Sequence, residues 1–71
     1  MTNAKKHLGN LSLNLYKILE EKGITKSSFA GGIGVTERVV YDYLSGKKLP
    51  SLERFWVIVS FLEIEAEELV R

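Results

Sequence analysis

Hydrophobic residues recur along this chain at the spacing of α-helices. Leu11, Leu15, Ile18 and Leu19 stand at positions i, i+4, i+7 and i+8, which is one stripe of an amphipathic helix that begins at residue 10 or 12. Further helices are predicted over residues 26–33, 36–44 and 52–62, with a short last one over 64–70. The pattern therefore predicts an all-α chain of five helices.

Residues of suitable chemistry mark the ends of these helices. Gly23 and Gly46 stand where a residue of left-handed conformation commonly ends a helix. Thr25, Thr36 and Ser51 precede the next helices, and the side-chain oxygen of each can accept a hydrogen bond from an amide of the first turn. These caps support the helix boundaries independently of the hydrophobic periodicity.

Two of the helices are short and follow one another across a tight Gly34-Val35 turn, which is the pattern of a helix-turn-helix. Gly34 supplies the permissive backbone at the bend, and Val35 fills the angle between the helices. The predicted inward faces consist of Phe29, Ala30 and Ile33 in the first helix and of Val40, Tyr43 and Leu44 in the second. The outward face of the second helix is then the candidate functional surface.

That outward face carries Glu37, Arg38, Val39, Tyr41 and Asp42. Arg38 is the strongest candidate for reading a base, because its planar fork can bind both acceptors of a guanine. An ion pair between Arg38 and Asp42, four residues on, is an alternative that is compatible with base reading. Glu37 fits two roles, contact with a cytosine amino group or stabilisation of the positive end of the helix dipole.

Gly31 and Gly32 lie inside the first helix of the pair and weaken it, since each costs about 1 kcal/mol relative to alanine in a helix interior. The Gly-Gly-Ile-Gly string is not expected to be a phosphate-binding loop, because no strand precedes it. We expect the two glycines instead to let another backbone, of DNA or of a protein, approach closely.

The helix predicted after Ser51 has more apolar residues than one buried face requires. Its core stripe is predicted to comprise Leu52, Phe55, Ile58, Val59 and Leu62. Trp56, Val57 and Phe61 remain, and we expect them to form a protein interface with another subunit, or to be covered by the N-terminal segment. In the last helix, Ile64, Ala66 and Leu69 are expected to close the core.

Charge is distributed unevenly along the chain. Residues 1–50 hold eight lysines and arginines against four acids, a net +4, whereas residues 51–71 hold two against five, a net −3. This asymmetry suggests a basic face for a polyanion and an acidic end directed elsewhere. Two ordinary solvated faces are the alternative.

Several classes of protein are not expected from the composition. The chain has no cysteine, and His7 is its only histidine, so we expect no disulfide, no metal site and no cofactor. We expect no enzyme, no membrane span and no small-molecule substrate, and we expect a soluble, cytoplasmic protein. Residues 1–9, which show little periodicity, are predicted to form a flexible arm ahead of a domain over residues 10–71.

A series of short motifs in a fixed order resembles one known family. The marks are Glu-Glu-Lys-Gly at the end of the first helix, Phe29-Ala30, Ile33-Gly34-Val35-Thr36, Ser45-Gly46-Lys47-Lys48, Pro50-Ser51-Leu52-Glu53 and Glu67-Glu68-Leu69. From Leu15 to Val70 the chain resembles the Cro and lambda-repressor-like helix-turn-helix domains, also called the xenobiotic-response-element (XRE) family. The resemblance implies a compact five-helix fold and sequence-specific binding of double-stranded operator DNA, usually by a homodimer with the recognition helix in the major groove.

The resemblance also assigns site residues by position. Lys26 falls where the family commonly has a glutamine that contacts phosphate, and Glu37, Arg38, Val39 and Asp42 fall where base-reading side chains stand. Together with flanking positions, the candidate DNA-binding residues are Lys26, Thr36, Glu37, Arg38, Val39, Tyr41, Asp42, Ser45, Lys47 and Lys48. At the base-reading positions, Glu37, Asp42 and Val39 stand where amide and hydroxyl side chains are usual in the family. Glu63 replaces the usual glycine before the last helix.

Two functions of different class remain open. The first is a phage or bacterial transcription regulator that represses by occupying an operator as a dimer, with helix 36–44 in the major groove. The second is a helix-turn-helix modulator or antirepressor that forms a hetero-complex with another regulator. The acidic groups on the recognition face and the surplus apolar residues Trp56, Val57 and Phe61 favour the second.

Overall fold

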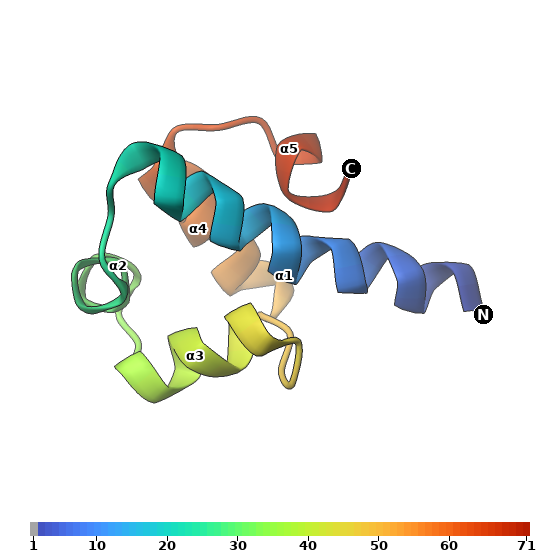
Figure 1. The fold of residues 1–71 in the computed structure, drawn as a ribbon, viewed down its shortest axis with the longest axis horizontal. Coiled ribbons are helices and arrows are strands. Elements are labelled where there is room, and N and C mark those ends of the chain that lie inside the picture. Colours follow the sequence, from blue (N-terminus) through green and yellow to red (C-terminus); the bar gives the residue numbers. More distant parts are fainter. Residues whose placement is uncertain (1) are drawn as a thin grey trace.

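The computed structural model describes the backbone of residues 2–71 and the side chains of residues 10–71. Over this part of the chain the secondary structure is entirely helical, as predicted (Figure 1). The helices are α1 (Thr2–Lys22), α2 (Lys26–Ile33), α3 (Glu37–Ser45), α4 (Leu52–Leu62) and α5 (Glu67–Val70). No helix within the described residues is long and apolar enough to span a membrane.

The first helix is longer than expected, because α1 begins at Thr2 and not at residue 10 or 12. Residues 2–9 contain no proline and include Ala4, Lys5 and Lys6, which have good helix propensity. They lack the hydrophobic stripe from which helical periodicity is recognised. Figure 1 shows this part of α1 projecting beyond the other helices. The division into a flexible arm over residues 1–9 and a domain over 10–71 remains a prediction.

The core takes side chains from all five helices. Its buried members are Leu11, Leu15, Ile18, Leu19, Phe29, Ala30, Ile33, Val40, Tyr43, Ile58, Leu62 and Leu69. The inward faces predicted for α1 and α2 are therefore confirmed. In α3, Val40 and Tyr43 are buried as predicted, whereas Leu44 is only half-buried. α1 packs against α3 and α5, and α2 packs against α3 and α4.

The placement of Leu52 in the core was wrong, since 74% of its surface is exposed. Ile58 and Leu62 of α4 are buried, and Phe55 and Val59 are half-buried. At 100° per residue, Leu52 lies about 120° around the helix axis from Ile58 and about 80° from Leu62. Turning the latter two residues inward therefore directs Leu52 to the surface.

The predicted caps are confirmed. The side chains of Thr25, Thr36 and Ser51 each accept a hydrogen bond from the amide three residues on, at 3.1, 3.3 and 3.1 Å. Gly23 and Gly46 adopt positive φ values of 67° and 81° at the ends of α1 and α3, which a residue without Cβ adopts readily. Local chemistry therefore determines where these helices begin and end.

The last helix is shorter than predicted, since α5 begins at Glu67 and not at residue 64. Glu63, which follows α4, has a φ of 56° and reverses the chain, so that the next residues cross toward α1 before a helix can resume. Leu69 is buried as expected, and Ile64 and Ala66 are half-buried. The Asn14 side-chain amide of α1 donates to the carbonyl oxygen of Leu69 at 2.9 Å and fastens α5 to α1.

Glu63 is the only residue other than glycine with positive φ in the described part of the chain. Left-handed backbone costs about 1–2 kcal/mol for a residue with a Cβ, so Glu63→Gly is expected to raise the free energy of unfolding by about 1 kcal/mol. Urea denaturation followed by circular dichroism measures this gain. Glu63→Ala is the matched control, because it removes the carboxylate but keeps the Cβ. An equal gain from both variants would show that charge, and not backbone strain, limits stability at this position.

Candidate nucleic-acid interface

The exposed face of α3 combines residues spaced i, i+3 and i+7, namely Arg38, Tyr41 and Ser45. Glu37, in the first turn, is also exposed. Val39 differs from the expectation of an outward side chain, because it is half-buried and packs against the core. The surface that α3 offers to a partner is therefore narrower than the set of residues expected from the sequence.

Packing and one hydrogen bond hold α3 in place. Val40 and Tyr43 are 0% and 4% exposed, and they attach the helix to the core. The Ser12 hydroxyl of α1 donates to the carbonyl oxygen of Tyr43 at 2.8 Å. This carbonyl lies in the last turn of α3, where backbone acceptors have no partner within the helix. Ser12 thus fixes the C-terminal end of the candidate recognition helix, a role that its place in the sequence did not indicate.

Arg38 and Asp42 form the ion pair considered from the sequence. Arg38 Nε lies 3.5 Å from Asp42 Oδ1, and the Arg38 side chain is 76% exposed whereas that of Asp42 is 15% exposed. Asp42 Oδ1 is buried and has no hydrogen-bond partner among the described residues. The carboxylate therefore lies beneath the guanidinium, where it orients Arg38 and has little surface of its own to present.

Lysines from two parts of the chain lie near α3. Lys47 and Lys48 follow the helix, and their backbone amides donate to the carbonyl oxygen of Asp42 at 2.9 and 3.2 Å, so the loop is held against the end of α3. Lys26, at the start of α2, lines a groove with Tyr41. Cations beside an exposed helix suit contact with the phosphates that border a DNA groove.

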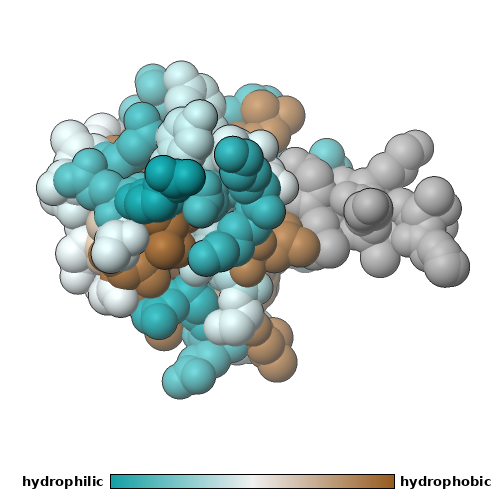
Figure 2. Space-filling model, turned by 90° about the horizontal axis from the view of Figure 1, so that it is seen from below, coloured by the Kyte–Doolittle hydropathy of each residue, from teal (hydrophilic) through white to brown (hydrophobic). Residues whose placement is uncertain are grey.

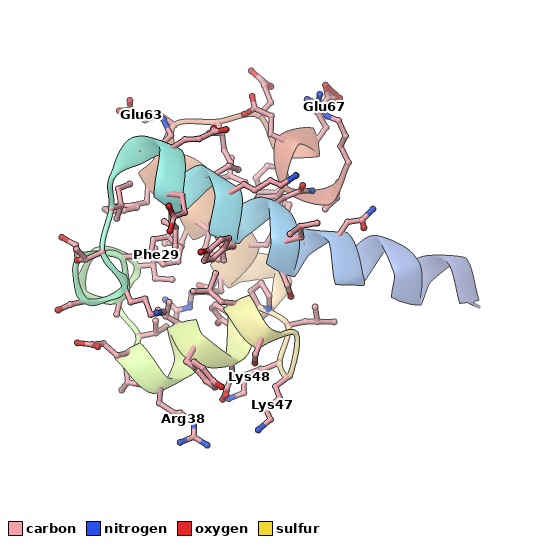
Figure 3. All side chains as sticks on the ribbon, in the orientation of Figure 1. Phe29, Arg38, Lys47, Lys48, Glu63 and Glu67 are labelled. Carbon is pink, nitrogen blue, oxygen red and sulfur yellow. The ribbon has the colours of Figure 1, made fainter. Side chains whose placement is uncertain are left out.

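The acidic end of the chain lies on the opposite side of the molecule, as expected. In Figure 3, Arg38, Lys47 and Lys48 lie together at one end, while Glu63 and Glu67 lie at the other. Figure 2 views the molecule from the side on which α3 lies, and hydrophilic residues cover most of this face, with smaller hydrophobic areas between them. The basic residues near α3 and the acidic residues of the C-terminal segment therefore lie on opposite sides of the folded protein.

Arg54 of α4 supports the turn between α2 and α3. Its Nη1 donates to the carbonyl oxygen of Ile33, the last residue of α2, at 2.6 Å. The carbonyl end of a helix carries partial negative charge and attracts cations, so the guanidinium satisfies both the hydrogen bond and the charge. No local pattern indicates this role of Arg54, because its partner is 21 positions away and only the packing of α4 on α2 brings the two together.

Gly32 makes room for a side chain of the same molecule, which corrects the expectation that it admits a foreign backbone. A Cβ built at Gly32 would overlap the ring of Phe61, with Cζ only 2.6 Å away. The Phe61 ring also packs on Phe29, with 5.8 Å between ring centroids. A Cβ at Gly31 would meet no atom within 4 Å. The two adjacent glycines therefore differ in role, and only Gly32 is needed for packing.

We expect alanine at these two positions to change the free energy of unfolding in opposite directions. Gly31→Ala is expected to raise the free energy of unfolding by about 1 kcal/mol, because alanine favours the helix and meets open space. Gly32→Ala is expected to lower it by about 1–3 kcal/mol, because the new methyl displaces the Phe61 ring. Urea denaturation of the two variants measures the difference. Similar gains from both would show that Phe61 moves aside without loss and does not contribute to the core.

The residues predicted to form a protein interface do not share one face. Trp56 is 54% exposed. Phe61 is 39% exposed, and its ring packs against Gly32 of α2. Helical geometry places the two about 140° apart around α4, and Val57 between them is half-buried. Trp56 instead shares an exposed face with Leu52, four residues earlier.

Comparison with known families agrees with this arrangement. A family model described as helix-turn-helix matches residues 15–69, which is well over half of the chain and contains α2, α3 and α4 completely. Comparisons with curated proteins and with solved structures found no match. The family consists of DNA-binding regulators and is not normally enzymatic. With its exposed α3 and its five-helix fold, the chain belongs to the helix-turn-helix family, as a Cro/lambda-repressor-like regulator of the XRE type.

Proposed function

We propose that this protein is a phage or bacterial repressor that inserts α3 into the major groove of an operator. The observation that supports this proposal most directly is Arg38, which is 76% exposed and lies on the same side of the molecule as Lys47 and Lys48 (Figure 3). An α-helix fits the width of the major groove, where each base pair presents a distinct pattern of donors and acceptors. The negatively charged end of the chain faces away from this surface.

The contacts within the groove follow from the chemistry of each side chain. Arg38 donates two hydrogen bonds to the acceptors of a guanine, and Asp42 restricts its guanidinium before binding. Glu37 accepts from a cytosine amino group. Thr36 already accepts a hydrogen bond from the amide of Val39, so its hydroxyl proton is available for a phosphate oxygen. Lys47 and Lys48 contact the phosphates of one strand.

One recognition helix contacts only a short stretch of DNA. We therefore propose that a homodimer binds two half-sites about one helical turn apart. Leu52 and Trp56, 74% and 54% exposed on one side of α4, are the candidate contacts between the subunits. Aromatic residues are enriched in interface cores, which favours Trp56 as the central residue. Sedimentation of the wild type and of Trp56→Ala tests this part of the proposal.

The decisive experiment titrates fluorescent DNA fragments with the protein at two salt concentrations. Arg38→Ala is expected to weaken binding to selected fragments by roughly 5- to 150-fold, the equivalent of about 1–3 kcal/mol for a bidentate base contact, and to leave binding to other fragments nearly unchanged. Arg71→Ala is the matched control, because it removes an exposed arginine at the acidic end. Weak, sequence-independent binding by all three proteins would contradict the operator function.

A second candidate is a modulator that binds another regulator and acts through protein contacts. The exposed pair Leu52 and Trp56 on α4 favours it, as does the exposed carboxylate of Glu37 on α3. For this function we expect the protein to form a complex with a co-expressed repressor, and we expect Trp56→Ala to weaken that complex. Arg38→Ala is then expected to leave DNA binding unchanged. The titration with DNA fragments therefore separates the two candidates.

A further inference from the structure

The loop that follows α3, over residues 46–49, carries two lysines but has no buried side chain, since all four of its residues are exposed. Hydrophobic packing therefore does not fix where Lys47 and Lys48 lie. In Figure 3 both lysines lie at the same end of the molecule as Arg38. Their position relative to α3 depends on the hydrogen bonds that the loop makes.

The hydrogen bonds of the loop backbone are local. The amides of Lys47 and Lys48 donate to the carbonyl oxygen of Asp42 at 2.9 and 3.2 Å. The Gly46 amide donates to the carbonyl oxygen of Tyr43 at 3.3 Å, and Gly46 has a φ of 81°. These bonds fold the loop back on the last turn of α3, but they do not attach it to any other helix.

Ser12 of α1 supplies that attachment. Its hydroxyl donates at 2.8 Å to the carbonyl oxygen of Tyr43, the same atom that accepts from the Gly46 amide. A Cβ built on Gly46 would lie 3.4 Å from Ser12 Oγ, so the hydroxyl lies against the turn itself, one residue before Lys47. Within residues 10–71, this is the only hydrogen bond that joins α3 or its loop to another helix.

We propose that Ser12 is a positioning residue for DNA binding, which holds the loop in the place where Lys47 and Lys48 meet phosphates. The inference rests on the proposed function, in which these lysines contact one DNA strand. A loop that is ordered before binding loses less conformational entropy when the complex forms. Phosphate contacts carry no sequence information, so Ser12 contributes to the affinity for every DNA fragment and not to the choice among them.

Ser12→Ala is expected to weaken binding to selected and unselected fragments alike by about 2- to 10-fold, as for the loss of one hydrogen bond. Asn14→Ala is the matched control and should bind like the wild type. Asn14 is also half-buried in α1, and it donates to a carbonyl oxygen of another helix, that of Leu69, at 2.9 Å. Circular dichroism confirms that both variants are folded during the titration. Equal weakening by both would overturn the proposal, because a general loss of stability would then be the cause.

A double-mutant cycle tests whether Ser12 acts through the two lysines. Ser12→Ala is expected to weaken DNA binding in the wild type, but to have little further effect in a protein that already carries Lys47→Ala and Lys48→Ala. A similar weakening in both proteins would show that Ser12 acts on α3 by another route, and it would overturn the proposal.

Arg38→Ala, measured in parallel, separates failure of this inference from failure of the proposed function. If Arg38→Ala loses affinity for selected fragments while Ser12→Ala binds like the wild type, the role of Ser12 is overturned and the operator function stands. A wild-type protein without affinity for DNA would overturn both. Hydrogen exchange of the Lys47 amide reports on the loop without DNA. We expect faster exchange in Ser12→Ala than in Asn14→Ala, and equal rates would contradict the attachment of the loop by Ser12.

Discussion

Phe29→Ala is expected to leave the protein largely unfolded at 25 °C. Phe29 is 0% exposed and packs on Phe61 with 5.8 Å between the ring centroids. Removing a buried phenylalanine side chain costs about 3–5 kcal/mol, through lost burial and the cavity that remains. A domain of this size has a total stability of only about 3–5 kcal/mol from one small core. The loss therefore equals most or all of the free energy of unfolding.

Circular dichroism at 222 nm and thermal denaturation measure this effect. Phe61→Ala is the control, because Phe61 belongs to the same aromatic pair but is 39% exposed, and burial loss scales with the area removed from water. We expect Phe61→Ala to fold and to melt at a moderately lower temperature. A cooperative transition of Phe29→Ala near the wild-type temperature would contradict the central place of Phe29 in the core.

Arg54→Ala is expected to lower the free energy of unfolding by about 1.5–3 kcal/mol, the range for a hydrogen bond that involves a charged group. The guanidinium donates to the carbonyl oxygen of Ile33 at 2.6 Å in a part-buried position. Without it, a carbonyl at the end of α2 loses its partner. Arg54→Lys keeps the charge but not the planar fork, so we expect a smaller loss.

Urea denaturation compares these variants with Arg38→Ala, the matched control. The Arg38 side chain is 76% exposed, whereas the Asp42 side chain with which it pairs at 3.5 Å is 15% exposed, and helix ion pairs spaced i, i+4 contribute less than about 1 kcal/mol. If Arg54→Ala and Arg38→Ala have the same stability, the bond from Arg54 to Ile33 does not hold the turn. Hydrogen exchange of the Val35 amide, which donates to the carbonyl oxygen of Ala30 at 2.9 Å, reports loosening at the turn directly.

Arg54 also links the two surfaces that the proposed function uses. α3 packs on α1 and α2, whereas α4 packs on α2. The bond from Arg54 to Ile33 and the contact of Phe61 with Gly32 thus connect α4, with its exposed Leu52 and Trp56, to the helix-turn-helix.

Much of the candidate site could be predicted from the sequence, because its signals are local. Thr36 caps α3 through an amide three residues away, and Arg38 pairs with Asp42 four residues away. The exposed fraction of each side chain could not be predicted. Val39 and Asp42 were expected on the surface but are partly buried, since the rotation of α3 about its axis is set by the burial of Val40 and Tyr43.

The sequence by itself determined that the chain is helical, where its caps lie, which residues of α1 and α2 face the core, that Val40 and Tyr43 of α3 are buried, and that the chain resembles the helix-turn-helix family. These properties depend on residues within one or two helical turns of one another. Only the tertiary structure decided that Gly32 receives Phe61, that Arg54 bonds to Ile33, that Leu52 is exposed, and that Tyr16 joins Lys26 and Tyr41 in one groove. These contacts join separate helices, and they depend on the rotation and crossing of whole helices, which no local pattern specifies.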